Sequence, residues 1–265
     1  MKVFISADIE GVSTTTTWDE TNRAHGYYPM HAKQMTEEVI ACIEGAKKAG
    51  ATEIVVRDAH DSGCNIDPTR MPSGVSLLRN WSGNPYSMVE GIDESFDAAM
   101  FIGYHSSASR AGNPLSHTLS GKCNSIKING KIASEFLIFS YACALVGVPT
   151  VFLSGDKMLC DDFKDLHPKL ITCAVKDGVG SMTINYPPEC TVSEIRQKSE
   201  QSLKQDMKAA LVKLPKHFEI ELSYKNHADC ESASWFPNAK RKDDTVLTFE
   251  TDDYFEVLRT LRWVL

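Results

Sequence analysis

The first 57 residues constrain the fold most strongly, because they contain two strand patterns separated by one long helix pattern. Residues 2–7 form an apolar run rich in β-forming residues, and residues 53–57 form a second such run. Between them, residues 29–48 repeat apolar side chains at helical spacing and end before Gly50. Two strands joined through a helix pair in parallel, since the helix crosses back over the sheet. The sequence therefore predicts an α/β fold with a mostly parallel sheet flanked by helices.

The later sequence continues this pattern and then becomes more charged. Further strands are predicted over 75–78, 98–102, 116–119, 150–153, 171–175, 218–223 and 245–250. A hairpin with an Asn-Gly turn is predicted over 125–132, and helices over 134–145, 193–211, 228–235 and the C-terminal residues. We expect a single catalytic unit, 1–265, with a metal-binding α/β part over about 1–186. The sequence becomes more charged after Pro187-Pro188, so a smaller C-terminal α/β lobe is expected over about 187–265.

Composition limits the kinds of partner that the chain can bind. Of its 265 residues 42% are hydrophobic, which is enough for one large core or two small ones. The net charge of -7 argues against a nucleic-acid partner, because binding phosphates needs concentrated positive charge. The basic run at 240–242 is followed at once by Asp243 and Asp244, which favours a solvated turn.

The cysteines and the longest uncharged run indicate the compartment. Eight cysteines contain no Cys-x-x-Cys pair, and several lie in apolar runs, as expected of buried, reduced thiols. No leader-like segment precedes the first predicted strand. The uncharged run that begins near Phe136 is interrupted by Gly147 and Pro149, which divide it into a helix and a strand of ordinary length. We therefore expect a cytoplasmic protein without a membrane-spanning segment.

Three predicted strands end in side chains that can bind a metal. Asp8 and Glu10 follow the first strand, His60 follows the second, and His105 follows the strand over 98–102. Alternation along a strand sends residues i and i+2 to one side, so Asp8 and Glu10 are expected to point together. The carboxyl ends of parallel strands meet at one edge of a sheet, where ligands bind in open α/β folds. Glu135, at the start of a predicted helix, is a fifth candidate.

Histidine and carboxylate ligands without cysteine are typical of catalytic zinc, and also suit manganese or cobalt. A pair of metals about 3.5–4 Å apart usually shares a bridging carboxylate, and Asp8 is best placed for that on the first strand. Each residue has a simpler interpretation on its own. A lone histidine at a strand end is more often a hydrogen-bonded structural residue, and Glu135 can face a helix dipole. Asp58 either forms ordinary polar contacts within its loop or holds His60 in place by a hydrogen bond.

His117 is placed differently, in the polar segment 114–118. It is a candidate general acid/base or nucleophile. The neighbouring Ser116 suggests a serine hydrolase, but the chain has no Gly-x-Ser-x-Gly elbow. It also has no glycine-rich loop of the kind that cradles phosphate.

Taken together, a series of short motifs in this chain resembles the D-aminopeptidase family, peptidase family M55. The motifs are Ala7-Asp8-Ile9-Glu10-Gly11, Asp58-Ala59-His60, Met88-Val89-Glu90-Gly91-Ile92-Asp93, Gly103-Tyr104-His105, Leu115-Ser116-His117, Asn129-Gly130 through Glu135, Gly147-Val148-Pro149, Ser154-Gly155-Asp156 and Asp244-Thr245-Val246. The likeness extends over nearly the whole chain, and as a set these motifs are specific.

The resemblance implies an aminopeptidase with two zinc ions per subunit that cleaves short peptides with an N-terminal D-residue such as D-Ala. It also implies a homodecameric ring that encloses the active sites. By motif match, the roles would be Asp8 as the bridge, Glu10 and His60 on one zinc, His105 and Glu135 on the other, and His117 as the catalytic histidine.

The sequence departs from the family pattern behind Glu135. Leu137 and Phe139 stand where the family tends to have a small residue and an asparagine, which leaves substrate preference open. Two alternatives therefore stay open. One is a dinuclear hydrolase of another small amide or of a phosphoester, although Arg110 is the only arginine in the predicted ligand loops. The other is a metal-dependent peptide-binding ring protein with impaired catalysis.

Overall fold

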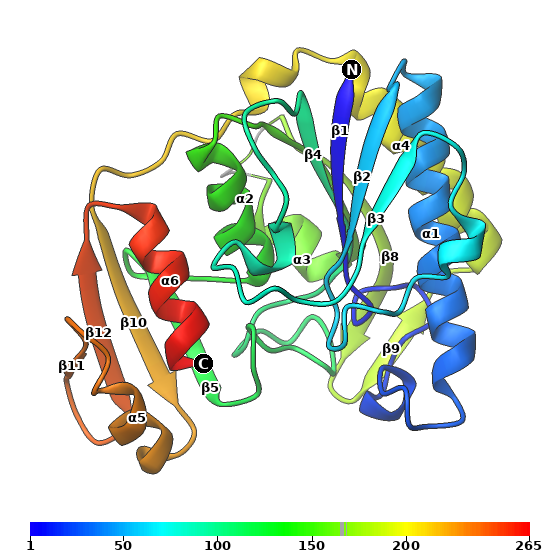
Figure 1. The fold of residues 1–265 in the computed structure, drawn as a ribbon. Helices are drawn as coiled ribbons and strands as arrows, with labels where there is room; N and C mark the ends of the chain where they lie inside the picture. The colour runs from blue at the N-terminus through cyan, green and yellow to red at the C-terminus, as the bar shows by residue number, and fades with distance from the viewer. Residues whose placement is uncertain (165–166, 168) are drawn as a thin grey trace.

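A computed structural model describes residues 1–164, 167 and 169–265 of the chain. Within these residues the strands form two sheets, which lie side by side in Figure 1. The larger sheet has the order β3-β2-β1-β4-β7-β8-β9. Its strands are β1 (Lys2–Ala7), β2 (Glu53–Asp58), β3 (Val75–Leu78), β4 (Ala98–Tyr104), β7 (Thr150–Asp156), β8 (Ile171–Val179) and β9 (Met182–Asn185). All neighbours pair in parallel except β8 and β9. The predicted α/β class is confirmed.

The strand order places a topological switch between β1 and β4. From β1 the chain moves outward through β2 to β3, and it then returns to pair β4 on the other side of β1. The loops that leave β1 and β4 therefore diverge and open a crevice at the carboxyl ends of these strands. The loop after β1 contains Asp8 and Glu10, and His105 follows β4 directly.

Helices cover both faces of the larger sheet, because its buried strands alternate apolar residues toward each side. Val3 and Ile5 of β1 pack with α1 (Tyr28–Lys48) and α4 (Pro188–Lys204) in one core. Phe4, between them, packs in a second core with α2 (Glu135–Leu145) and α6 (Tyr254–Val264). The short helix α3 (Lys157–Asp162) follows β7.

The second sheet is antiparallel and joins two distant parts of the chain. Its order is β11-β12-β10-β5-β6, and α6 packs on its inner face (Figure 1). The elements are β5 (Cys123–Ile128), β6 (Lys131–Ile132), β10 (Phe218–Tyr224), α5 (His227–Ala233), β11 (Lys240–Arg241) and β12 (Val246–Thr251). A division of the chain near residue 187 stays a prediction. The layers of the fold do not follow it, because β5 and β6 precede it and α4 packs on α1.

Most predicted elements are present, and the exceptions have local causes. Residues 116–119 were predicted as a strand, which is wrong: they form a loop in which Leu119 has φ 62 and only Thr118 bridges Ser120. The helix predicted over 193–211 starts earlier and ends at Lys204, after which the chain forms a 3₁₀ turn at Met207–Ala210. The Asn129-Gly130 hairpin is confirmed, with both residues at positive φ, as its tight turn requires.

The cysteines are free thiols in the described residues. Six of them are buried, Cys64 is half-buried and Cys190 is exposed.

No helix in the described part of the chain is long and apolar enough to cross a membrane. Three further 3₁₀ turns lie at Trp18–Glu20, Pro68–Arg70 and Ser87–Val89.

Candidate metal centre

The loop after β1 presents Asp8 and Glu10 to the crevice. The strand ends at Ala7, so the two carboxylates converge through a loop and not through the strand alternation that the sequence suggested. This loop packs tightly on the end of β4. The Gly11 amide donates to the Gly103 carbonyl at 2.8 Å, and a Cβ on Gly11 would lie 1.8 Å from the Tyr104 carbonyl oxygen. Glycine at position 11 therefore allows the two ligand-bearing segments to approach each other.

His60, after β2, directs one ring nitrogen at both of these carboxylates. Its Nδ1 lies 3.3 Å from Asp8 Oδ1 and 3.1 Å from Glu10 Oε2. Its Nε2 lies 3.1 Å from the carbonyl oxygen of Thr21. A carbonyl oxygen only accepts hydrogen bonds, so Nε2 carries the ring proton and the Nδ1 lone pair faces the carboxylates.

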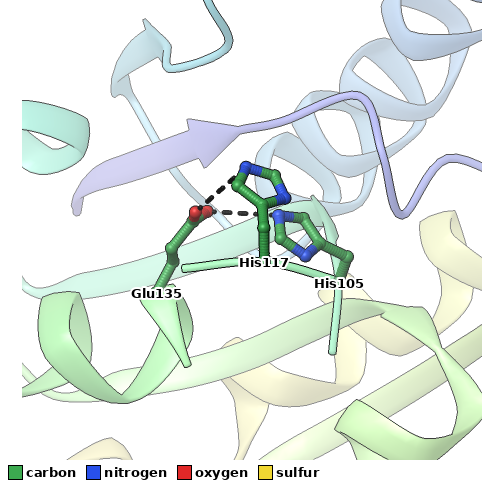
Figure 2. Close-up of side chains that lie close together, drawn as sticks. All are labelled: His105, His117 and Glu135. Carbon is green, nitrogen blue, oxygen red and sulfur yellow. Dashed lines mark ion pairs between the residues drawn. The ribbon is translucent and has the colours of Figure 1, made fainter. Parts of the chain in front are cut away.

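His105, after β4, repeats this arrangement with the opposite nitrogen. Its Nδ1 lies 2.9 Å from the Ser106 carbonyl and so carries the proton. Its Nε2 lies 3.5 Å from Asp8 Oδ2 and 3.3 Å from Glu135 Oε2, the contact drawn in Figure 2. Glu135 begins α2, and its other oxygen accepts from the Leu119 amide at 2.7 Å.

Asp8 lies between His60 and His105 and turns one carboxylate oxygen toward each of them. Its Oδ1 is 3.3 Å from His60, which also contacts Glu10, and its Oδ2 is 3.5 Å from His105, which also contacts Glu135. Glu10 is not confined to one side, because its donor atom also lies within 4.8 Å of those of Asp8 and His105. A carboxylate that faces two histidines with its two oxygens can bridge two metals.

Without a metal, protons balance the charge of this centre. Burial and the adjacent Glu10 carboxylate raise the pKa of Asp8 well above its usual value. Burial also acts on Glu10, but the charge of His60 outweighs it and lowers the pKa of Glu10 well below the ordinary range. Burial lowers the pKa of His105, whereas the Glu135 and Asp8 carboxylates raise it more strongly, to about 10. The buried carboxylates thus favour the protonated, positively charged forms of His60 and His105.

The donor atoms also fit a metal. Glu10 Oε2 and His105 Nε2 are buried and have no hydrogen-bond partner in the described residues. Such orphaned atoms are costly, and here one ring nitrogen of His60 and one of His105 face carboxylate oxygens. Two sets, Asp8–Glu10–His105 and His105–His117–Glu135, each have donor atoms within 4.8 Å of one another. Buried imidazole and carboxylate donors, each ring held by a carbonyl, suit a cation such as Zn²⁺.

His117 lies at the edge of this centre, in the loop that had been predicted as a strand. Its Nδ1 is 2.9 Å from the Leu115 carbonyl, so the free nitrogen is Nε2, which lies 3.6 Å from Glu135 Oε1 (Figure 2). The ring stacks on His105 with centroids 4.4 Å apart. The neighbouring Ser116 donates its hydroxyl to the Asn113 carbonyl at 2.7 Å and has no base beside it, which argues against a serine nucleophile.

A cavity of about 810 Å³ opens in front of these residues. Asp8, Glu10, His60, Glu135 and His117 line one end of it. Among the other lining side chains, several apolar ones belong to the core that contains α2 and α6: Trp81, Met88, Ile138, Phe139, Leu258 and Leu261. The exposed Trp18 also lines the cavity. A space of this size admits a small ligand whose reacting bond reaches the candidate metal centre.

The family model described as D-aminopeptidase, peptidase family M55, matches residues 1–263. The chain belongs to the D-aminopeptidase family. A D-aminopeptidase of Bacillus subtilis (strain 168) is 27% identical over 265 residues, which covers 98% of this chain and 95% of that protein. A solved structure, the Zn-dependent D-aminopeptidase DppA from Bacillus subtilis, described as a self-compartmentalizing protease, matches with a TM-score of 0.94 at 26% identity. The match covers 100% of this chain and 96% of the DppA chain.

Membership of this family confirms the resemblance seen in the motifs and the prediction of a metallo-aminopeptidase. The structure brings all six predicted side chains of the family motifs to one place. Asp58 turns out to order a loop and does not contact the His60 ring. Its carboxylate accepts from the amides of Asn65 and Ile66, and the Asn65 side chain donates to the His60 carbonyl at 2.7 Å.

Two buried residues that hydrogen-bond to the loops of the candidate centre were not predicted from the sequence. Lys176 of β8 is fully buried, and its ammonium donates to the carbonyls of Glu10 and Thr15. Asp156, at the end of β7, accepts from the Ser106 amide and hydroxyl at 2.6 Å each, next to His105. A lysine inside an otherwise apolar strand was the one available signal for Lys176, because a buried ammonium needs nearby acceptors.

Proposed function

We propose that this chain is an aminopeptidase that uses two zinc ions per subunit to hydrolyse short peptides with an N-terminal D-amino acid such as D-Ala. The observation that carries the proposal is the placement of Asp8, whose two oxygens face two different histidines, each of which also contacts a glutamate. One zinc would be held by Glu10, His60 and Asp8, and the other by His105, Glu135 and Asp8. The Zn-dependent relative of high structural similarity supports the choice of metal.

Zinc held by these residues would supply a Lewis acid for the scissile carbonyl and would lower the pKa of bound water toward ~7. The remaining tasks belong to the residues of the chain. The carbonyls of Thr21 and Ser106 keep His60 and His105 in the tautomers that present lone pairs inward. His117 Nε2 is free of the backbone and lines the cavity, so it can give a proton to the leaving amine or attack the carbonyl.

The cavity fits a small peptide better than a phosphoester. Four carboxylates, from Asp8, Glu10, Asp61 and Glu135, line it. Asp61 is not a proposed zinc ligand, so its carboxylate stays free to attract the amino terminus of a peptide and to repel a phosphate dianion. Phe139, which replaces the family's asparagine, is buried and forms part of the cavity wall. We expect this wall to favour small apolar side chains, as in alanine peptides.

Turnover assays test the proposal and separate it from its alternatives. The purified protein would be stripped of metal, reloaded with zinc, and given D-Ala-D-Ala, L-Ala-L-Ala and a phosphoester. Zinc-dependent cleavage with preference for the D-peptide supports the proposed reaction. Cleavage of the phosphoester alone would favour the other hydrolase, and tight peptide binding without turnover would favour a ring protein that has lost catalysis.

We further propose that the subunits assemble into a homodecameric ring in the cytoplasm. The relative described as self-compartmentalizing supports assembly. Large apolar side chains also remain exposed on the single chain, with Trp235 81% and Trp263 70% exposed. Exposed aromatic residues of this size are typical of surfaces that bind another protein. The free thiols fit a reducing compartment.

A further inference from the structure

The cavity in front of the candidate metal centre is lined by several acidic side chains and a single basic one. The carboxylates are those of Asp8, Glu10, Asp61 and Glu135. Among the described residues that line the cavity, Arg262 is the only lysine or arginine, and it comes from the C-terminal helix α6. The wall therefore contains four carboxylates and one permanently positive side chain.

Helix α6 presents Arg262 to the cavity by its periodicity. Leu258, Leu261 and Arg262 line the cavity, as expected of residues three and four positions apart on one helix face. The helix is anchored on α2, which begins with Glu135, because the buried Tyr254 hydroxyl donates to the Ile138 carbonyl at 2.8 Å. The backbone of α6 is thus tied to the helix that carries Glu135.

Arg262 has no ion pair or side-chain hydrogen bond in the part of the chain that the structure describes, although it is exposed. The neighbouring Arg259 differs, since it pairs with Glu256 and lines a separate cavity of about 330 Å³. Arg262 is the basic residue in the last turn of α6, where it also complements the helix dipole. That effect needs no cavity, so it does not account for the position of Arg262 on the cavity wall.

We propose that Arg262 binds the C-terminal carboxylate of the peptide, and that the enzyme therefore selects short peptides with a free C-terminus. The inference rests on the proposed aminopeptidase function. A short peptide carries an amino group at one end and a carboxylate at the other, matching the two charged features of the cavity. Guanidinium binds carboxylate through two parallel hydrogen bonds, and the apolar wall at Ile138, Phe139 and Leu258 takes the side chains between them.

The experiment compares D-Ala-D-Ala with its C-terminal amide, using zinc-loaded wild type, Arg262→Ala and the matched control Arg259→Ala. The wild type is expected to prefer the free acid by about tenfold in kcat/KM, the usual worth of one charge-assisted contact. Arg262→Ala is expected to lose this preference through a higher KM with kcat unchanged, because the contact is made equally in the ground and transition states. Arg259→Ala is expected to behave as the wild type.

Equal use of acid and amide by the wild type would overturn the inference while leaving the aminopeptidase function intact. So would an Arg262→Ala variant that keeps the preference for the acid. The wild-type comparison needs no substitution, so it remains decisive even if a variant folds poorly. Failure of the wild type to cleave either peptide would instead overturn the proposed function on which the inference rests.

Discussion

At the scale of single residues, Asp8 is the side chain on which both metals are expected to depend. Removing a bridge takes one ligand from each ion and leaves their mutual repulsion unscreened. We expect Asp8→Ala to lose both zinc ions, and His60→Ala or His105→Ala to lose mainly one. Metal analysis of the purified variants checks this, with wild type as the reference. About two zinc ions per chain in Asp8→Ala would show that the bridge is assigned wrongly.

The geometry of His117 fits two roles, metal ligand and catalytic residue. Its donor atom lies within 4.8 Å of those of His105 and Glu135, and its ring lines the cavity. If it acts on the substrate, His117→Ala should keep both metals and its fold while turnover falls on the order of 10²-fold or more. The exposed His217, directly before β10 of the second sheet, is a suitable control. Loss of one zinc in His117→Ala would identify it as a ligand, and a near-normal rate would make it structural.

At the scale of elements, β8 supports the loop that follows β1. The Lys176 ammonium is buried and donates to the carbonyls of Glu10 and Thr15, so it connects two points of this loop to the sheet. Lys176→Met keeps the length of the side chain but removes both hydrogen bonds, and should cost about 2 kcal/mol of stability or more. We expect a lower Tm and weaker zinc retention, measured against Lys157→Met, whose exposed ammonium pairs with Asp161. Unchanged zinc retention would refute the supporting role.

At the scale of the whole molecule, the proposed ring predicts a definite mass. Light scattering at micromolar concentration should give the mass of ten chains, each of 29.4 kDa. Exposed Trp235 and Trp263 are expected to become covered in the assembly, since large apolar side chains gain most from leaving water. Their fluorescence should therefore shift to shorter wavelength in the assembled protein. A monomer mass throughout the concentration range would rule out the ring.

Much of the fold could be predicted from local sequence pattern. The runs at β1, β2 and β4 are apolar, and each ends in residues able to bind a metal, so the parallel sheet and the gathering of Asp8, His60 and His105 at one edge followed from strand geometry. Glu135 was a candidate from its place at a predicted helix start and His117 from its polar segment, and the family motifs implied their roles. Local pattern failed at residues 116–119, because Leu119 adopts a left-handed conformation in which its amide reaches Glu135.

The sequence by itself determined the sheet, the ligand types and the family, since each depends on residues close together in the chain or on a motif order. Only the tertiary structure decided what surrounds the centre. Lys176 lies beneath Glu10, and Arg262 faces the cavity that Asp8 lines, although long stretches of chain separate them. Such contacts arise when β8 joins the sheet and α6 packs on α2, and no local periodicity encodes them. Side-chain environment is a property of packing between distant segments, and the substrate pocket is built from such contacts.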